Sequence, residues 1–328
     1  MSKNRGTILA PMFLVIDKPP GITSHDVVAA VRAVTGVKKV GHTGTLDPFA
    51  TGVLPLALGG ATRLIQFLDE SLKIYDATIA LGSQTDTGDP TGDVEREAPV
   101  PELSEARVLE VLDSFLGDRM QVPPAYSAVK KDGKPLYAYA RKGQKVEVDA
   151  RPITIFGLDL VDLQPNTVRV RIHCSRGTYA RVLANEIAEA LGTVGHLSAL
   201  ARERSGPFGL EGSLSFPALA ELVAEEPGHD WHAVLLSRGR REERVPWKRR
   251  DTVLEGLKAS FRKPLDCLSH LPLADVDERG AKRVRSGGLP PTVPGGVEMG
   301  GRYLVVQGEQ LVAVAERQPV GGRVLRVV

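Results

Sequence analysis

Apolar and polar residues alternate with a period of two in several short segments, which predicts β-strands. The clearest segment is 73–81, KIYDATIAL, in which Tyr75 and every second residue after it share one face. The segments 151–163 and 166–174 predict a pair of neighbouring strands, and an apolar run at 12–17 predicts another. These strands indicate a sheet with one buried face.

Apolar residues spaced by three and four positions predict helices between these strands. Ser24 is the expected N-cap of the first helix, whose valines between positions 27 and 34 lie on or near one face and which ends before Gly36. Three further helices are expected at about 61–68, 108–115 and 178–191. The segments 41–55 and 83–97, which are rich in glycine and polar residues, are expected to be loops.

The periodic pattern breaks at about residue 228, which predicts a division of the chain. We expect a large first domain over 1–227 with an inserted polar segment at about 82–142, a basic linker or insertion over 228–263, and a small β-rich domain over 264–328. The basic run in this segment is compatible with a solvated linker or with a segment that contacts phosphate groups. The run comprises Arg238, Arg240, Arg241, Arg244, Lys248, Arg249 and Arg250.

The composition is that of an ordinary soluble globular protein, with 42% hydrophobic and 25% charged residues in a chain of 328. No apolar run approaches the roughly 20 residues that span a bilayer, and the N-terminal segment lacks a signal-peptide pattern. The two cysteines, Cys174 and Cys267, form neither a disulfide framework nor a zinc motif. We expect a cytoplasmic protein with no contact to a membrane. The net charge of +2 permits nucleic-acid binding without requiring it.

One segment, Gly41 to Pro55 (GHTGTLDPFATGVLP), carries the clearest candidate chemistry, because phosphate loops, dinucleotide fingerprints, nucleophile elbows and zinc motifs are all absent from the sequence. Pro48 disfavours helical geometry at Asp47 and holds this residue extended. Glycines in the same segment permit a close approach of the backbone to another chain. On this pattern alone, a plain Asp-Pro turn is the favoured interpretation of Asp47.

Five motifs in order resemble those of the bacterial tRNA pseudouridine synthases of the TruB type. GHTGTLDPFATGVLP closely resembles the catalytic motif of that family, and KPPGITSHDVV before it resembles the N-terminal motif. The resemblance covers residues 12–208, and the tail is similar to an appended PUA RNA-binding module. The three remaining motifs are Lys73-Ile-Tyr75, Arg176-Gly-Thr-Tyr-Ala-Arg181 and GHLSALARERSGPF at 195–208.

The resemblance implies an α+β pseudouridine-synthase fold, with a mixed, largely antiparallel central sheet flanked by helices and a small C-terminal β-rich PUA-like domain. It implies an isomerase that converts the T-arm uridine conventionally numbered 55 in tRNA to pseudouridine after flipping it out of its stack. Asp47 is the implied essential carboxylate, and attack at C6 of the base and chemistry at C1′ of the sugar both remain open. The reaction is redox-neutral and gains or loses no atoms, so no metal and no organic cofactor is expected.

The resemblance also assigns roles to individual residues. It implies that Arg181 forms an ion pair with Asp47 and that Tyr75 stacks on the extruded base. It implies that His42 enters the T loop of the RNA. The further residues expected to bind substrate are Tyr179, Leu200, Lys18, Gly41, Thr43 and Gly44.

Two departures from the family pattern and three alternative functions remain. Ala201 stands where the family usually has arginine, so a basic contact near the pocket is expected to be missing, and the basic segment at 228–263 is longer than usual. A noncatalytic tRNA-binding protein or RNA chaperone, and an RNA-guided pseudouridine synthase, use the same scaffold. A glycosidase needs paired carboxylates, whereas the motifs offer one. The expected partner is the tRNA T-arm stem-loop, with no obligate protein partner and a monomeric state.

Overall fold

The protein is described by a computed structural model over residues 10–69, 71–144, 146–222 and 250–328. Most of the basic run predicted at 238–250 therefore lies outside the described residues.

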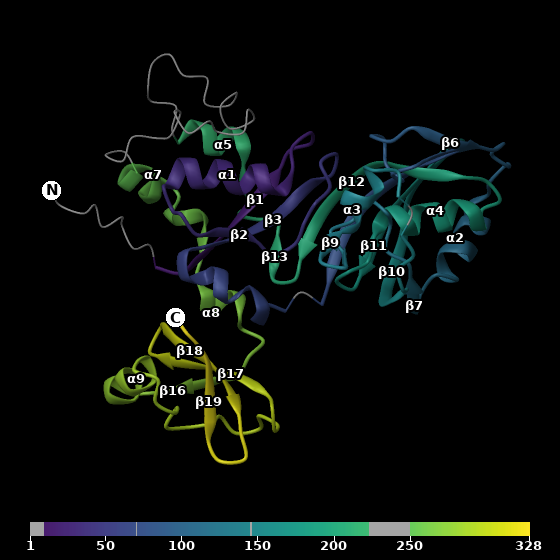
Figure 1. Ribbon diagram of the computed structural model, residues 1–328. Coiled ribbons are helices and arrows are strands. Elements are labelled where there is room, and N and C mark those ends of the chain that lie inside the picture. Colours follow the sequence, from purple (N-terminus) through teal and green to yellow (C-terminus); the bar gives the residue numbers. More distant parts are fainter. Residues whose placement is uncertain (1–9, 70, 145, 223–249) are drawn as a thin grey trace.

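A mixed sheet of eleven strands forms the framework of the larger part of the molecule (Figure 1). Its central path runs β14-β1-β3-β12-β4-β11-β10-β7, and β2, β13 and β15 pair at its sides. Within the described part of this sheet only the pairs β1–β14 and β3–β12 are parallel, so the predicted mixed and largely antiparallel sheet is confirmed. The strands are β1 (Met12–Lys18), β2 (Val40–His42), β3 (Thr51–Leu58), β4 (Lys73–Leu81), β7 (Gly117–Gln121), β10 (Arg151–Gln164), β11 (Thr167–Cys174), β12 (Gly195–Ser205), β13 (Phe208–Gly209), β14 (Leu214–Ser215) and β15 (Phe261–Arg262).

Helices cover this sheet in two groups at its opposite ends (Figure 1). One group lies at the end that contains β1, and the other packs on β10 and β12. The helices are α1 (Ser24–Thr35), α2 (Glu105–Asp113), α3 (Leu136–Ala140), α4 (Ala180–Ala190), α5 (Phe216–Glu221), α7 (Arg250–Gly256), α8 (Pro264–Cys267) and α9 (Glu278–Arg285), with 3-10 turns η1 (Gly59–Arg63), η2 (Ile65–Phe67) and η4 (Lys258–Ser260).

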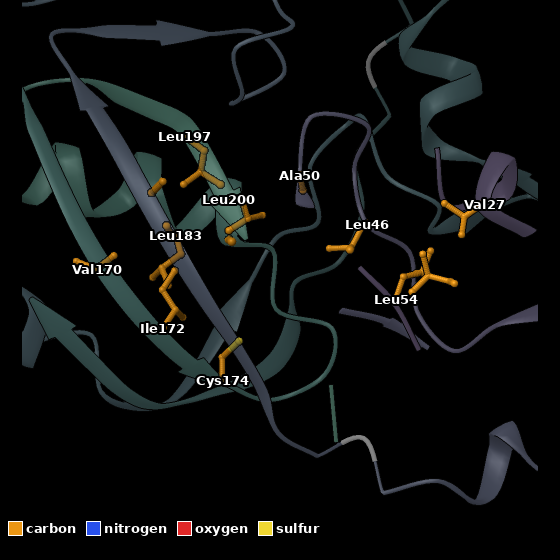
Figure 2. Close-up of a cluster of buried hydrophobic side chains, with 14 of the residues drawn as sticks. Val27, Leu46, Ala50, Leu54, Val170, Ile172, Cys174, Leu183, Leu197 and Leu200 are labelled. Atoms are coloured by element: carbon orange, nitrogen blue, oxygen red, sulfur yellow. The ribbon is translucent and has the colours of Figure 1, made fainter. Parts of the chain in front are cut away.

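The main core forms because alternate residues of the central strands face the helices. In β4, Ala77 and Ile79 are buried, as the period of two predicts, and α4 packs Leu183 against the same layer. Figure 2 shows this layer continuing from the strands to Leu46 and Ala50 in the loop before β3. The loop is therefore anchored in the core and does not lie free on the surface.

A second sheet, β16-β17-β18-β19, forms a separate C-terminal lobe that α9 covers (Figure 1). An apolar cluster joins this lobe to the main sheet: Phe13 and Phe67 belong to it on one side, and Leu268 and Leu304 on the other. The strands are β16 (Leu273–Asp275), β17 (Arg302–Gln307), β18 (Gln310–Arg317) and β19 (Gly322–Val327). The small C-terminal β-rich domain predicted from the sequence is present.

The described part of the expected linker belongs to the main core. Val253 and Leu257 are buried with α1 and its neighbours, and β15 pairs with β1. We therefore propose that the boundary of the C-terminal domain lies close to Pro264.

Several local predictions need correction. Thr23, and not Ser24, is the N-cap of α1: its side chain accepts from the Asp26 amide, whereas the Ser24 hydroxyl is buried against Leu46. The segment 61–68 forms 3-10 turns instead of an α-helix. The expected loops at 41–55 and 83–97 contain β2, most of β3, and the short pair β5 (Ser83–Thr85) and β6 (Val94–Glu97). A second short pair, β8 (Lys130–Lys131) and β9 (Lys134–Pro135), lies in the inserted segment.

Candidate active site

Asp47 lies in the loop between β2 and β3. Residues from the end of β1 to the start of α1 hydrogen-bond to this loop. The Ser24 hydroxyl accepts from the Leu46 amide and donates to the Leu46 carbonyl. The Pro48 carbonyl accepts from the Gly21 amide and from Lys18 Nζ. Because these bonds fix the residues on both sides of Asp47, its carboxylate has a defined position.

Arg181, in the first turn of α4, forms the predicted ion pair with Asp47. Its Nε lies 2.9 Å from Asp47 Oδ2, and a second nitrogen lies 3.4 Å from Oδ1. The same guanidinium donates to the main-chain carbonyls of Thr87 and Tyr126. The structure thus brings together a loop and a helix that are 134 positions apart in the sequence.

Burial is the largest influence on the Asp47 carboxyl and raises its pKa above the ordinary value. The Arg181 guanidinium acts in the opposite direction, and the Asp89 carboxylate raises the pKa further. Asp89 is itself buried, 3.7 Å from Arg181 Nη1. The charge of Asp47 therefore depends on the arginine beside it.

The Asp47 carboxylate faces a cavity of about 700 Å³. Tyr75 on β4, Tyr179 before α4 and Leu200 on β12 line its walls, and Figure 2 shows Leu200 near the Ala50 end of the loop. Burial raises the pKa of the Tyr75 hydroxyl, and the nearby Arg202 opposes that increase. A planar base that enters this cavity meets aromatic and aliphatic walls, with the Asp47 carboxylate at the edge.

The other predicted substrate contacts fall into three places. Thr43 and Gly44 line the cavity. Gly41 and His42 lie on β2, adjacent to the lining residues and partly exposed. Lys18 is 0% exposed, and its Nζ donates to the carbonyls of Pro19 and Pro48. Because this side chain has no exposed surface, we propose that Lys18 supports the loop.

Two residues of the site were missed at the level of sequence. Asp89 lies in a segment read as a plain loop, and no periodicity marks it. Arg202 is 1% exposed and lines the cavity, two positions after Leu200 on the same strand. The period of two in β12 was the signal that places both on the cavity face.

The expected effect of Ala201 is also corrected by the alternation of β12. Ala201 is opposite Asp76 in register, on the face of the sheet away from Leu200 and Arg202. On that face Arg169 already binds Asp76 through two hydrogen bonds, of 2.8 and 2.6 Å. An arginine at position 201 would thus lie outside the pocket, and its absence removes no contact there.

The described residues contain neither a metal-binding cluster nor a membrane-spanning helix. In this part of the chain no group of three or more histidine, cysteine, aspartate and glutamate side chains is placed to hold a metal ion. In the same part, no helix is long and apolar enough to cross a membrane.

The fold and the site together define the class of the pseudouridine synthases. A chain in the crystal structure of a Cbf5-Nop10-Gar1 complex superimposes with a TM-score of 0.69 at 25% identity, over 96% of this chain and 84% of that chain. A structure of an H/ACA RNP bound to a substrate RNA shares the fold, with a TM-score of 0.68 at 23% identity, over 96% of this chain and 84% of that one.

Sequence comparison gives the family. A family model described as "TruB family pseudouridylate synthase (N terminal domain)" matches residues 32–180. The tRNA pseudouridine synthase B of Geobacter sulfurreducens is 42% identical over 93% of this chain and 92% of its own length. That of Geotalea uraniireducens is 42% identical over 85% of this chain and 80% of its own length. The chain belongs to the TruB family of pseudouridylate synthases.

Proposed function

We propose that this protein converts the T-arm uridine at position 55 of tRNA to pseudouridine, with Asp47 as the essential carboxylate. The single observation that carries the proposal is the Asp47–Arg181 pair at the edge of a tyrosine-lined cavity. The relatives that match nearly the whole chain bear the name tRNA pseudouridine synthase B, which supports tRNA as the substrate.

In this reaction the N1–C1′ bond of the uridine breaks, the base turns, and a C5–C1′ bond forms. The proton on C5 leaves and N1 ends with a proton, so the overall change is an isomerisation. Asp47 acts as nucleophile or as the stabiliser of positive character at C1′, for which it must be ionised. Arg181 favours the ionised form by offsetting the effect of burial.

Before any bond breaks, the uridine has to leave its stack. Extrusion costs a few kcal/mol, which contacts with the enzyme must offset. Tyr75 and Tyr179 supply aromatic surfaces for the base in the cavity. His42, next to the lining residues Thr43 and Gly44, is placed to take up the vacated space in the RNA.

We infer that the enzyme acts alone on tRNA, as a monomer in the cytoplasm. The relatives called tRNA pseudouridine synthase B are 42% identical, whereas the chain from the Cbf5-Nop10-Gar1 complex is 25% identical. This difference favours a stand-alone enzyme over the RNA-guided alternative.

The test is release of tritium from C5-labelled uridine in a T-arm hairpin, with purified protein and no added guide RNA. We expect the wild type to release the label, and Asp47→Ala to bind the hairpin without releasing it. Asp159→Ala is the matched control, because this carboxylate lies on the exposed face beside His173, and it is expected to keep wild-type activity. Label release by Asp47→Ala at the wild-type rate contradicts the proposal. Tight binding by a wild type that releases no label favours the noncatalytic alternative.

A further inference from the structure

Arg202 has an unusual set of partners for a fully buried cation. Its Nε donates to the Val53 carbonyl at 2.8 Å, Nη1 to the Thr45 carbonyl at 3.3 Å, and Nη2 to the Gly44 carbonyl at 3.2 Å. Its side chain is one of the largest that solvent does not reach. Among the described residues, no carboxylate lies within ion-pair distance of it.

A buried guanidinium without a carboxylate is costly unless hydrogen bonds compensate it. Here two of its hydrogen bonds go to carbonyls of the loop ahead of Asp47, and the third goes to the Val53 carbonyl on β3, which follows Asp47. The planar arrangement of the guanidinium donors holds three carbonyls at fixed relative positions, which a flexible ammonium does less well. The bonds therefore define the path of the chain on both sides of the carboxylate.

The main chain of Arg202 fixes the same loop a second time. Arg202 pairs in parallel with Gly52, which has a φ of 98°. A methyl group on Gly52 would lie 2.3 Å from the Arg202 carbonyl oxygen, so the two backbones are in direct contact. Both the side chain and the backbone of one residue thus anchor the loop that carries Asp47.

The other side of the guanidinium faces Tyr75. Arg202 and Tyr75 are opposite each other in the β12–β4 register, and both line the cavity. The positive charge opposes the increase that burial causes in the pKa of the Tyr75 hydroxyl, as expected for a cation close to it. Arg202 consequently binds the main chain on both sides of Asp47 and also lies opposite Tyr75.

We propose that Arg202 is a positioning residue for the isomerisation. It binds the Asp47 loop on one side and faces Tyr75 on the other, and in this way it fixes the carboxylate relative to the surface on which the base stacks. This inference rests on the proposed function. Arg202 itself needs no contact with the RNA. Its removal should lower the rate of the chemical step much more than the affinity for RNA, since a displacement of about 1 Å at a reacting group costs about 100-fold in rate.

The experiment compares Arg202→Met and Arg202→Lys with Arg204→Met, whose arginine is on the same strand but is exposed and donates to the Gly206 carbonyl. Single-turnover label release, affinity for the T-arm hairpin and the thermal unfolding midpoint are measured for each. We expect Arg202→Met to lose about 100-fold in single-turnover rate. The affinity of this variant should stay within about threefold of wild type, because uniform binding is not affected.

Arg202→Lys should recover part of the rate, because it keeps the charge but loses the rigid donor set. Arg204→Met should behave as wild type. If Arg202→Met does not fold, Arg202→Lys carries the test, with an expected loss of about 10-fold in rate at unchanged affinity.

Wild-type single-turnover rates in the folded Arg202 variants overturn the inference and leave the proposed function intact. An affinity that falls by the same factor as the rate, together with a lower unfolding midpoint, assigns Arg202 to the fold alone. This outcome also overturns the inference. Inactivity of the wild type overturns the proposed function, and the inference with it.

Discussion

Arg181 and Asp47 form an ion pair whose two members differ in exposure: 4% of the arginine side chain is accessible, against 34% of the aspartate. Main-chain carbonyls of Thr87 and Tyr126 hold the guanidinium in place. The cation is therefore fixed in the wall, while the carboxylate keeps a free edge toward the cavity. Such a pair compensates the negative charge of the Asp47 carboxylate and still leaves the carboxylate able to react.

Replacing Arg181 by methionine should shift the acid limb of the pH–rate profile upward. Burial already raises the pKa of Asp47, and Arg181 is the first group that opposes it, so its loss raises this pKa further. Since the reaction needs ionised Asp47, a higher pH is then required for the same rate. We also expect a loss of about 100-fold at neutral pH, because the variant lacks the cation that keeps Asp47 ionised and in position.

Single-turnover rates measured across the pH range check this prediction. Arg169→Met is a suitable control, because its guanidinium binds Asp76 on the face away from the cavity. An acid limb of Arg181→Met that coincides with that of the wild type would show that the arginine does not control the charge of Asp47.

The free energy of unfolding of the wild type, measured relative to that of Lys18→Met, should increase from neutral to alkaline pH. Burial lowers the pKa of Lys18 from 10.5 to about 8 in the folded protein, while the unfolded chain keeps the ordinary value. Between these two values the unfolded state binds more protons, so the free energy of unfolding rises with pH. The gain over the whole interval is at most about 3 kcal/mol.

Urea denaturation at pH 7.0 to 10 measures this difference, with pH values of about 7, 8, 9 and 10 bracketing the lowered pKa. Because all other groups are shared, the comparison with Lys18→Met isolates the one ammonium. A constant difference between the two proteins over this interval would contradict the lowered pKa.

Gly52→Ala should destabilise the protein much more than Gly117→Ala. Both glycines have similar backbone conformations, with φ of 98° and 91°. A methyl group at Gly52 meets the Arg202 backbone at 2.3 Å, whereas nothing lies within 4 Å at Gly117. Left-handed strain alone costs about 1 kcal/mol, and the collision should add about 1–3 kcal/mol. Equal unfolding free energies of the two variants would argue against the close β3–β12 contact.

Leu268→Ala should weaken both lobes of the molecule at once. Leu268 is fully buried in the apolar cluster that joins the C-terminal sheet to Phe13 and Phe67. Truncation of a buried leucine costs about 2–5 kcal/mol. Scanning calorimetry should show a lower transition temperature for both sheets, and Leu289→Ala, at an exposed leucine, should show almost no change. A variant that shifts only the C-terminal transition would show that the cluster does not couple the two sheets.

The sequence was sufficient to predict a strand or helix wherever that element carries its own periodic pattern. The strand predicted at 73–81 is β4, and the strand predicted at 166–174 matches β11 to within one residue. The helices beginning near Ser24 and Thr178 are present, and the first ends just before Gly36 as predicted, with Gly36 in the left-handed conformation. Their amphipathic patterns reflect burial on one side, which depends little on distant partners.

Short strands could not be predicted in the same way, because their partners define them. β2 has three residues and exists through its pairing with β3, and β7 through its pairing with β10. In the site, the Asp47 motif was recognisable, but the position of Arg202 depends on the β12–β4 register. The burial of Lys18 likewise becomes visible only when the turn after β1 and the Asp47 loop are packed together.

The alternation of β12 divides the strand into two sets of side chains with different constraints. Leu200 and Arg202 face the cavity, whereas Ala201 faces the outer side, where Glu203 pairs with Arg171. Substitutions of the outer set should therefore have little effect on catalysis. A single-residue insertion or deletion ahead of Leu200 would exchange the two sets and inactivate the enzyme even though every side chain was retained.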